Sequence, residues 1–223
     1  MSVSRETFTP LLAALAAEPD PHTTVSDPEA ALEVHVADSL SGLEVPELAS
    51  ARRIADIGAG AGFPGLVLAL ALPRAEVDLI ESVGRKTAVV DRLIQAAELS
   101  NARSITARAE DFARTPAVLG GGSEAYDAVT ARAVGPLAVL VEYATPLLRP
   151  DGVLVAWKGA RDAAEEAAGA AAAEKVGMAV TGVVPVQPYP ASENRHLHVF
   201  RKIAPTPPGF PRRAGMARKR PLA

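Results

Sequence analysis

The chain has 223 residues, of which 48% are hydrophobic, 22% charged and 4% aromatic, a composition typical of one globular domain of ordinary size. It contains no cysteine, which excludes disulfides, thiolate metal sites, iron–sulfur clusters and cysteine nucleophiles. No apolar run approaches the roughly 18 residues that a membrane-spanning helix needs. We therefore expect a cytoplasmic protein with no membrane partner, acting as a monomer.

Residues 1–50 are predicted to form a helical extension. Arg5 and the short apolar run after it resemble the start of a signal peptide, but the apolar residues have the spacing of an amphipathic helix: Phe8, Leu11, Leu12 and Leu15. A capping residue, Ser26 or Asp27, stands before Pro28 and predicts the start of a second helix that continues to about residue 40.

A different pattern begins at about residue 51 and predicts an α/β domain over residues 51–204. Short strand-like segments at 54–57, 77–80, 104–106, 126–129 and 153–157 alternate with helix-like stretches at 65–72, 86–99, 136–148 and 161–176. This alternation is typical of βαβ units in a parallel sheet. Two later strands, 180–186 and 196–202, have no helix between them and should pair antiparallel at one edge. The expected fold is an α/β fold with a mostly parallel seven-stranded sheet.

The carboxyl-terminal segment, residues 205–223, has a charge of +5, whereas the rest of the chain has a charge of −8. Its basic residues are Arg212, Arg213, Arg218, Lys219 and Arg220. Because it is rich in proline and glycine, we expect an extended or disordered arm outside the core. A basic arm favours a polyanionic partner such as RNA, and a tail that only aids solubility is the alternative.

Three alternating glycines, Gly58, Gly60 and Gly62, follow the first predicted strand, and a helix should begin at about Pro64. Glycines between a strand and a helix allow the backbone to approach a ligand closely. Glu81 ends the next strand, where a carboxylate accepts hydrogen bonds from the two hydroxyls of a ribose. This combination predicts a cofactor that contains a nucleoside.

The glycine loop also has the dinucleotide fingerprint, so an enzyme that uses NAD or FAD is an alternative. Asp56 argues against it, because a carboxylate beside the loop repels a pyrophosphate and attracts the ammonium or sulfonium of S-adenosylmethionine. The late antiparallel strand pair is typical of class I methyltransferase sheets. We therefore predict a Rossmann-like, class I S-adenosylmethionine-dependent methyltransferase. Glu110, after the third strand, is a candidate acceptor for the adenine amine, or else only an acid in the first turn of a helix.

Residues 129–136 lie at the end of the fourth predicted strand, where a methyltransferase places the groups that face the methyl acceptor. It lacks the acid, asparagine or serine followed by two prolines and an aromatic that enzymes methylating exocyclic amines usually have. Methylation at C5 of a pyrimidine would need the missing cysteine. Guanine N7 remains a natural acceptor, because its lone pair is already nucleophilic and no proton has to be removed. Arg132 is the charged group nearest the expected acceptor position.

Motifs along the whole chain support one family. In chain order they are residues 35–40 (HVADSL), 56–65, 109–110, 130–133 (TARA), 157–159 (WKG), 194–197 (NRHL), 211–215 (PRRAG) and 219–222 (KRPL). Together they resemble the bacterial small-subunit rRNA guanine-N7 methyltransferases, also called glucose-inhibited division protein B.

The resemblance implies methylation of a guanine, guanine 527 in conventional rRNA numbering, in the decoding-region loop of 16S rRNA or of the small ribosomal subunit. It implies cofactor contacts at Gly58, Phe63, Ala109, Glu110 and Arg132. It also implies substrate-positioning or RNA contacts at Arg132, Lys158, Arg195 and His196, with structural salt bridges as the alternative for Lys158 and Arg195. The catalytic residues stay unassigned. No metal site is expected at His196 and His198, since no third ligand is evident.

Two other functions stay open at the level of the residues. One is a methyltransferase of a small molecule or protein, for which the basic tail would be incidental. The other is a non-catalytic RNA-binding module that uses the cofactor only for stability.

Overall fold

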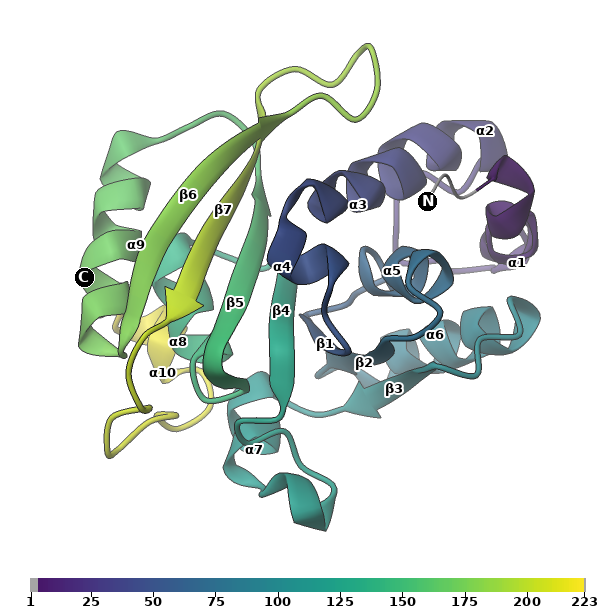
Figure 1. Cartoon of the computed structure of the whole chain (residues 1–223). Coiled ribbons are helices and arrows are strands. Elements are labelled where there is room, and N and C mark those ends of the chain that lie inside the picture. The colour runs from purple at the N-terminus through teal and green to yellow at the C-terminus, as the bar shows by residue number, and fades with distance from the viewer. Residues whose placement is uncertain (1–3, 223) are drawn as a thin grey trace.

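The computed structural model describes residues 4–222. Its centre is a seven-stranded sheet with the order β3-β2-β1-β4-β5-β7-β6 (Figure 1). The strands are β1 (Arg53–Ile57), β2 (Glu76–Glu81), β3 (Ala102–Thr106), β4 (Tyr126–Arg132), β5 (Leu148–Lys158), β6 (Met178–Val186) and β7 (Arg195–Lys202). The first five strands pair in parallel, and β7 is antiparallel to both β5 and β6. The predicted sheet and its antiparallel edge are confirmed.

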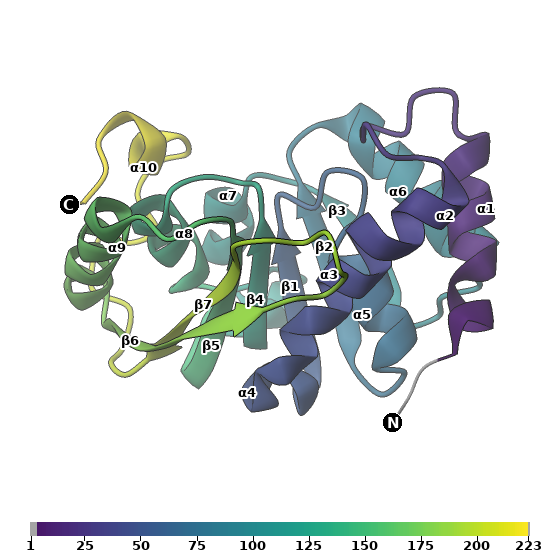
Figure 2. The ribbon, with the colours of Figure 1, turned by 90° about the horizontal axis from the view of Figure 1, so that it is seen from above.

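Helices cover both faces of the sheet (Figure 2). They are α1 (Thr9–Ala17), α2 (Pro28–Ala31), α3 (Asp38–Leu40), α4 (Pro46–Ala49), α5 (Gly65–Ala71), α6 (Gly84–Ala96), α7 (Ala109–Arg114), α8 (Leu137–Ala144), α9 (Ala163–Lys175) and α10 (Met216–Lys219). One apolar cluster joins α1, α5 and α6 to the sheet, and a second joins α7, α8 and α9 to its other face. Within residues 4–222, no helix has the length and apolar character needed to cross a bilayer.

The predicted helix beyond residue 28 starts as expected. The Asp27 side chain accepts a hydrogen bond from the Ala30 amide at 2.9 Å, and Pro28 is the first helical residue. A π-helical stretch, Leu32–Ala37, connects α2 to α3, and the indole of Trp157 on β5 donates to the Asp38 carbonyl at 2.8 Å. The amino-terminal helices therefore lie directly against the carboxyl end of the central strands.

One predicted helix is too long. The apolar run at 136–148 was expected to be a single helix, but α8 ends at Ala144 and β5 already begins at Leu148. Pro146 explains the difference, since proline has no amide hydrogen to donate and disfavours helical geometry in the residue before it.

The carboxyl-terminal segment was predicted to be an extended or disordered arm, but it is docked on the domain. Arg212 forms a two-pronged ion pair with the buried Glu142 of α8, and the single-turn helix α10 buries Ala217 against the domain. Arg114 holds the segment from another side, by donating to the carbonyls of Pro211 and Arg212. Its proline and glycine content prevents the segment from forming a core of its own. Its arginines nevertheless bind groups on the domain surface, so tertiary contacts order the segment.

Candidate cofactor and substrate site

The glycine loop between β1 and α5 has the open backbone that a ligand needs. Gly58, Gly60 and Gly62 all have positive φ, at 66°, 57° and 95°. A Cβ added at Gly60 would meet nothing nearer than the Gly58 carbonyl at 3.8 Å, whereas one at Gly62 would lie 2.4 Å from the Leu66 side chain. Gly60 therefore leaves space for a ligand, and Gly62 serves the packing of the loop on α5.

Asp56 lies beneath this loop rather than on a cavity wall. Its buried carboxylate accepts from the Gly65 amide at 3.0 Å and from the Thr130 hydroxyl at 2.9 Å. Burial raises the pKa of Asp56 to about 6, against the opposing effects of these hydrogen bonds and of the Arg132 charge. The structure thus gives Asp56 the role of holding the first turn of α5 to β4, instead of the predicted attraction of a cationic ligand.

A cavity of about 280 Å³ opens beside the loop. Gly58 and Glu81 line it together with Ala109 and Glu110 of α7, four residues that the sequence assigned to the cofactor. The Glu81 carboxylate accepts from the amides of Gly60 at 3.2 Å and Val83 at 2.9 Å. Open glycine backbone, a carboxylate at the end of β2 and a second carboxylate at α7 fit the ribose and adenine of S-adenosylmethionine.

A second cavity, of about 440 Å³, lies on the other side of Gly58 and contains Phe63 and Arg132. The Phe63 ring stacks on the His35 ring with centroids 4.5 Å apart, and the Arg132 guanidinium lies 5.9 Å from the Phe63 centroid. Arg132 donates to the Asp38 carboxylate at 2.7 Å. The arginine is therefore held between β4 and the amino-terminal helices.

His35 is neutral in this arrangement. Burial, assisted by the charge of Arg132, lowers its pKa to about 4. Its Nε2 lies 3.0 Å from the Val25 carbonyl, which only accepts, so Nε2 carries the hydrogen and Nδ1 faces Arg132 at 3.4 Å with its lone pair.

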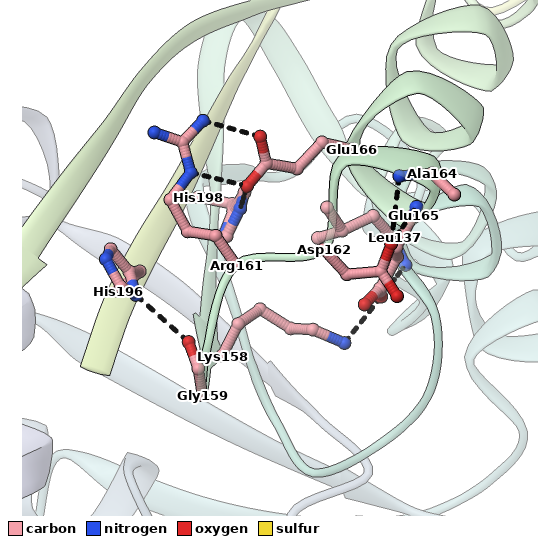
Figure 3. Close-up of polar contacts among 10 residues, drawn as sticks. All are labelled: Leu137, Lys158, Gly159, Arg161, Asp162, Ala164, Glu165, Glu166, His196 and His198. Carbon is pink, nitrogen blue, oxygen red and sulfur yellow. Dashed lines mark hydrogen bonds and ion pairs between the residues drawn. The ribbon is translucent and has the colours of Figure 1, made fainter. Parts of the chain in front are cut away.

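A third cavity, of about 210 Å³, continues from the second and shares Asp38, Arg132 and Arg195 with it. Lys158 and His196 also line it, so the four candidate positioning residues come together. His196 Nδ1 lies 3.0 Å from the Gly159 carbonyl, and Lys158 donates to Glu165 of α9 at 2.6 Å (Figure 3).

The side chains of Lys158 and Arg195 differ in whether they already have a partner. For Lys158 the structure shows the ion pair that was the alternative, whereas the guanidinium of Arg195 has no hydrogen-bond partner within residues 4–222. The same Glu165 carboxylate accepts from the Leu137 amide at 2.9 Å, so it ties the start of α8 to the end of β5 (Figure 3). The sequence did not predict this place for Glu165, since only the fold brings α9 to the loop after β4.

His198 has different polar partners from His196. Its Nε2 lies 3.1 Å from Glu166, which also binds Arg161 (Figure 3). Arg161 and then His198 lower the pKa of Glu166 to about 2. In the part of the chain from residue 4 to residue 222, no three His, Asp or Glu side chains are grouped as metal ligands.

The basic carboxyl-terminal residues divide into two groups. The guanidinium groups of Arg212 and Arg218 bind Glu142 and the Val134 carbonyl. Arg213, Lys219 and Arg220 are exposed, and within the described chain their side chains have no hydrogen-bond partner. Three of the five cations proposed for RNA are therefore free to meet phosphates.

This chain resembles known proteins at two levels, first in its fold and second in its sequence. Solved structures with TM-scores of 0.56 include a 16S rRNA (adenine(1408)-N(1))-methyltransferase from Catenulisporales acidiphilia, at 15% identity over 74% of this chain and 92% of that chain. Aeropyrum pernix fibrillarin with natively bound S-adenosyl-L-methionine also has a TM-score of 0.56, at 17% identity over 74% of this chain and 72% of that chain. At such identities these structures establish the class I methyltransferase fold alone.

Closer relatives come from bacteria. The ribosomal RNA small subunit methyltransferase G of Chloroflexus aggregans is 42% identical over 200 residues, which cover 90% of this chain and 82% of the relative. That of Desulfitobacterium hafniense is 37% identical over 200 residues, 90% of this chain and 81% of the relative. A sequence model of the family described as rRNA small subunit methyltransferase G (GidB) matches residues 20–197. The chain therefore belongs to the rRNA small subunit methyltransferase G family.

Proposed function

We propose that this protein transfers the methyl group of S-adenosylmethionine to N7 of a guanine in 16S rRNA, and that guanine 527 is the target. The family supports the rRNA substrate, and the fit of the first cavity supports the cofactor. The cofactor supplies an electrophilic methyl group on sulfur, and the N7 lone pair forms the new bond, so the products are S-adenosylhomocysteine and N7-methylguanine. An rRNA substrate supports a location in the cytoplasm.

The observation that carries the choice of N7 is the lack of a free carboxylate base around Arg132. Among residues 4–222, Asp38 is the one carboxylate on the walls of the second and third cavities, and its charge is paired with Arg132. His35 is neutral, and its two ring nitrogens face Val25 and Arg132. An acceptor that must lose a proton would need a base in this place, whereas N7 needs only to be held in line with the methyl group.

The charge of these walls favours RNA over a neutral small molecule. Lys86, Arg132 and Arg195 line the second cavity, and Lys158 lines the third. Within residues 4–222, the side chains of Lys86 and Arg195 have no acidic partner. Unpaired cations at the mouth of a cavity attract phosphates, while Arg132 stays fixed by Asp38.

The pH dependence of a single turnover tests the acceptor. With small subunits and labelled S-adenosylmethionine at saturation, the rate should be flat from pH 6 to pH 8. Two side chains on these walls could still act as a base: His196, whose Nδ1 faces the Gly159 carbonyl, and His22, whose Nδ1 lies 3.2 Å from Asp20. A rate that rises with pH in the wild type and becomes flat in His196→Gln or in His22→Gln would refute N7 and indicate an acceptor that loses a proton.

The substrate class and the position need a separate measurement. Label should enter 16S rRNA, and neither protein extract nor small metabolites. Borohydride and aniline treatment, which cleaves RNA at N7-methylguanine, should cut at guanine 527. Label in protein or metabolites would support the other kind of methyltransferase, and binding without any transfer would support the non-catalytic module.

A further inference from the structure

The carboxyl-terminal segment reaches the first cavity from the far end of the chain. Arg218 of α10 and Tyr143 of α8 complete the wall opposite Glu81. Figure 2 shows α10, in yellow, beside α8 and α9 and apart from the amino-terminal helices. Tyr143 lies within the residues that the family model matches, 20–197, whereas Arg218 lies beyond them.

A strong anchor fixes the segment. Glu142 is 2% exposed, and its carboxylate binds Arg212 in a two-pronged arrangement with an Nε to Oε1 distance of 2.7 Å. Arg212 also donates to the Arg220 carbonyl at 2.9 Å. Because a buried carboxylate without its arginine is costly, this pair holds residues 212–220 on the domain.

Two contacts then link the anchored segment to the cavity. The Gly215 amide donates to Oε1 of Glu110 at 2.7 Å, and the Arg218 guanidinium donates to the Val134 carbonyl at 2.8 Å. Oε2 of Glu110 has no partner within residues 4–222. The segment therefore fixes one carboxylate oxygen of Glu110 and leaves the other for a ligand.

The electrostatics around Tyr143 agree with this geometry. Burial and the charge of Glu110 raise the pKa of Tyr143, and the Arg218 charge opposes the rise. The Glu110 carboxylate, the Arg218 guanidinium and the Tyr143 phenol thus line the same cavity. A guanidinium has five N–H donors, so Arg218 keeps donors after its bond to Val134.

We propose that residues 211–220 form the outer wall of the adenine subsite and that Arg218 contacts the adenine ring, an inference that rests on the proposed use of S-adenosylmethionine. The adenine amine is a donor that lies next to ring nitrogens that accept. Oε2 of Glu110 accepts from the amine, and Arg218 donates to a neighbouring ring nitrogen. The docked segment is thereby part of the cofactor site, in addition to any contact of its free cations with RNA.

Calorimetry on the full chain tests the contact. Arg218→Ala should weaken binding of S-adenosylhomocysteine about tenfold or more, the effect of losing a hydrogen bond from a charged group. Lys219→Ala is the matched control, since Lys219 is the neighbouring exposed cation and has no side-chain partner within the described chain. The affinity of Lys219→Ala for S-adenosylhomocysteine should stay within about twofold of the wild-type value, because exposed charges contribute little.

A second probe locates the contact on the ligand. Methylthioadenosine has the adenine and ribose but no amino-acid group, so Arg218→Ala should weaken it by the same factor. Equal affinity of Arg218→Ala and wild type, an equal loss in Lys219→Ala, or a loss for S-adenosylhomocysteine alone would each overturn the adenine contact. If the wild type binds neither probe, the proposed function fails as well.

Hydrogen exchange separates contact from anchoring. Amides of residues 211–222 should stay protected in Arg218→Ala, because the Glu142–Arg212 pair remains. Loss of that protection together with loss of affinity would show that Arg218 only holds the segment, and would overturn its direct contact with adenine.

Discussion

Arg132 at the end of β4 and Asp38 in α3 form an ion pair of 2.7 Å across 94 residues of sequence. The pair connects the amino-terminal helices to the strand at which we propose that the methyl acceptor binds. Arg132 also lies over the Phe63 ring and next to His35, so its position depends on three neighbours.

Asp38→Asn should therefore lower activity more than stability. The amide keeps the shape but loses the charge that orients Arg132, and we expect kcat/KM for small subunits to fall about 10-fold to 100-fold, by about 1.4 kcal/mol for each factor of ten. Glu33→Gln is the control, since Glu33 is exposed in the same helical stretch and its carboxylate has no ion-pair partner within residues 4–222. Steady-state kinetics measure the activity of each variant, and a thermal melt measures its stability. Equal activity of the two variants would contradict a role for the pair.

Glu81→Gln should weaken the cofactor. The carboxylate is predicted to accept the ribose hydroxyls, and it already receives the Gly60 and Val83 amides. Loss of a charged acceptor costs about 1.5–3 kcal/mol of binding free energy. Calorimetry with S-adenosylhomocysteine should show this loss, and an unchanged affinity would exclude the ribose contact.

Alanine substitutions at Gly60 and Gly62 should affect different properties, ligand affinity at Gly60 and stability at Gly62. Gly60→Ala has room for its Cβ within the protein, so the fold should lose only about 1–2 kcal/mol for the left-handed backbone while ligand affinity drops sharply. Gly62→Ala brings its Cβ to 2.4 Å from Leu66 and should mainly lower the melting temperature. If Gly60→Ala binds S-adenosylhomocysteine normally, the ligand does not pass over this glycine.

His35 and Asp56 should affect the pH dependence of stability in opposite directions. The pKa of His35 falls to about 4, so its contribution to the free energy of unfolding is complete above the ordinary histidine range and is lost as pH falls towards 4. The pKa of Asp56 rises from 3.8 to about 6, so its contribution is present at low pH and is lost as pH rises through 6.

Asp56→Asn removes the second contribution and should make stability fall more steeply on acidification than in the wild type. The difference between the two proteins should change by roughly 3 kcal/mol between pH 7 and pH 4, the equivalent of about two pKa units. Urea unfolding at each pH measures it. Parallel pH profiles would show that Asp56 titrates normally.

Replacing the free cations Arg213, Lys219 and Arg220 by alanine should reduce the salt dependence of RNA binding. Each phosphate contact on single-stranded RNA contributes about 0.7 to the slope of log affinity against log salt, so three contacts contribute about 2. Cofactor affinity should hardly change, since none of these side chains lines the first cavity. An unaltered slope would favour the solubility role of the segment.

The sequence by itself determined the sheet, because strand, helix and turn signals are local. The run from Asp56 through the glycines to Gly65 predicted the end of a strand, a glycine loop and the start of a helix, and the structure has each in that place. The lack of cysteine, visible in composition alone, already limited the chemistry. Glu81 and Glu110 were identified from their positions after strands, since parallel strands bring their carboxyl ends to one edge.

Tertiary structure alone decided the rest, because it depends on partners far apart in sequence. Asp56 looked like a ligand-facing carboxylate, yet burial under α5 gives it the Gly65 amide and the Thr130 hydroxyl. Arg212 looked like a free cation in a proline-rich arm, yet it meets Glu142, 70 residues earlier. Local composition gives the propensity of a segment to order, whereas the free energy of docking comes from a distant surface that no local pattern contains.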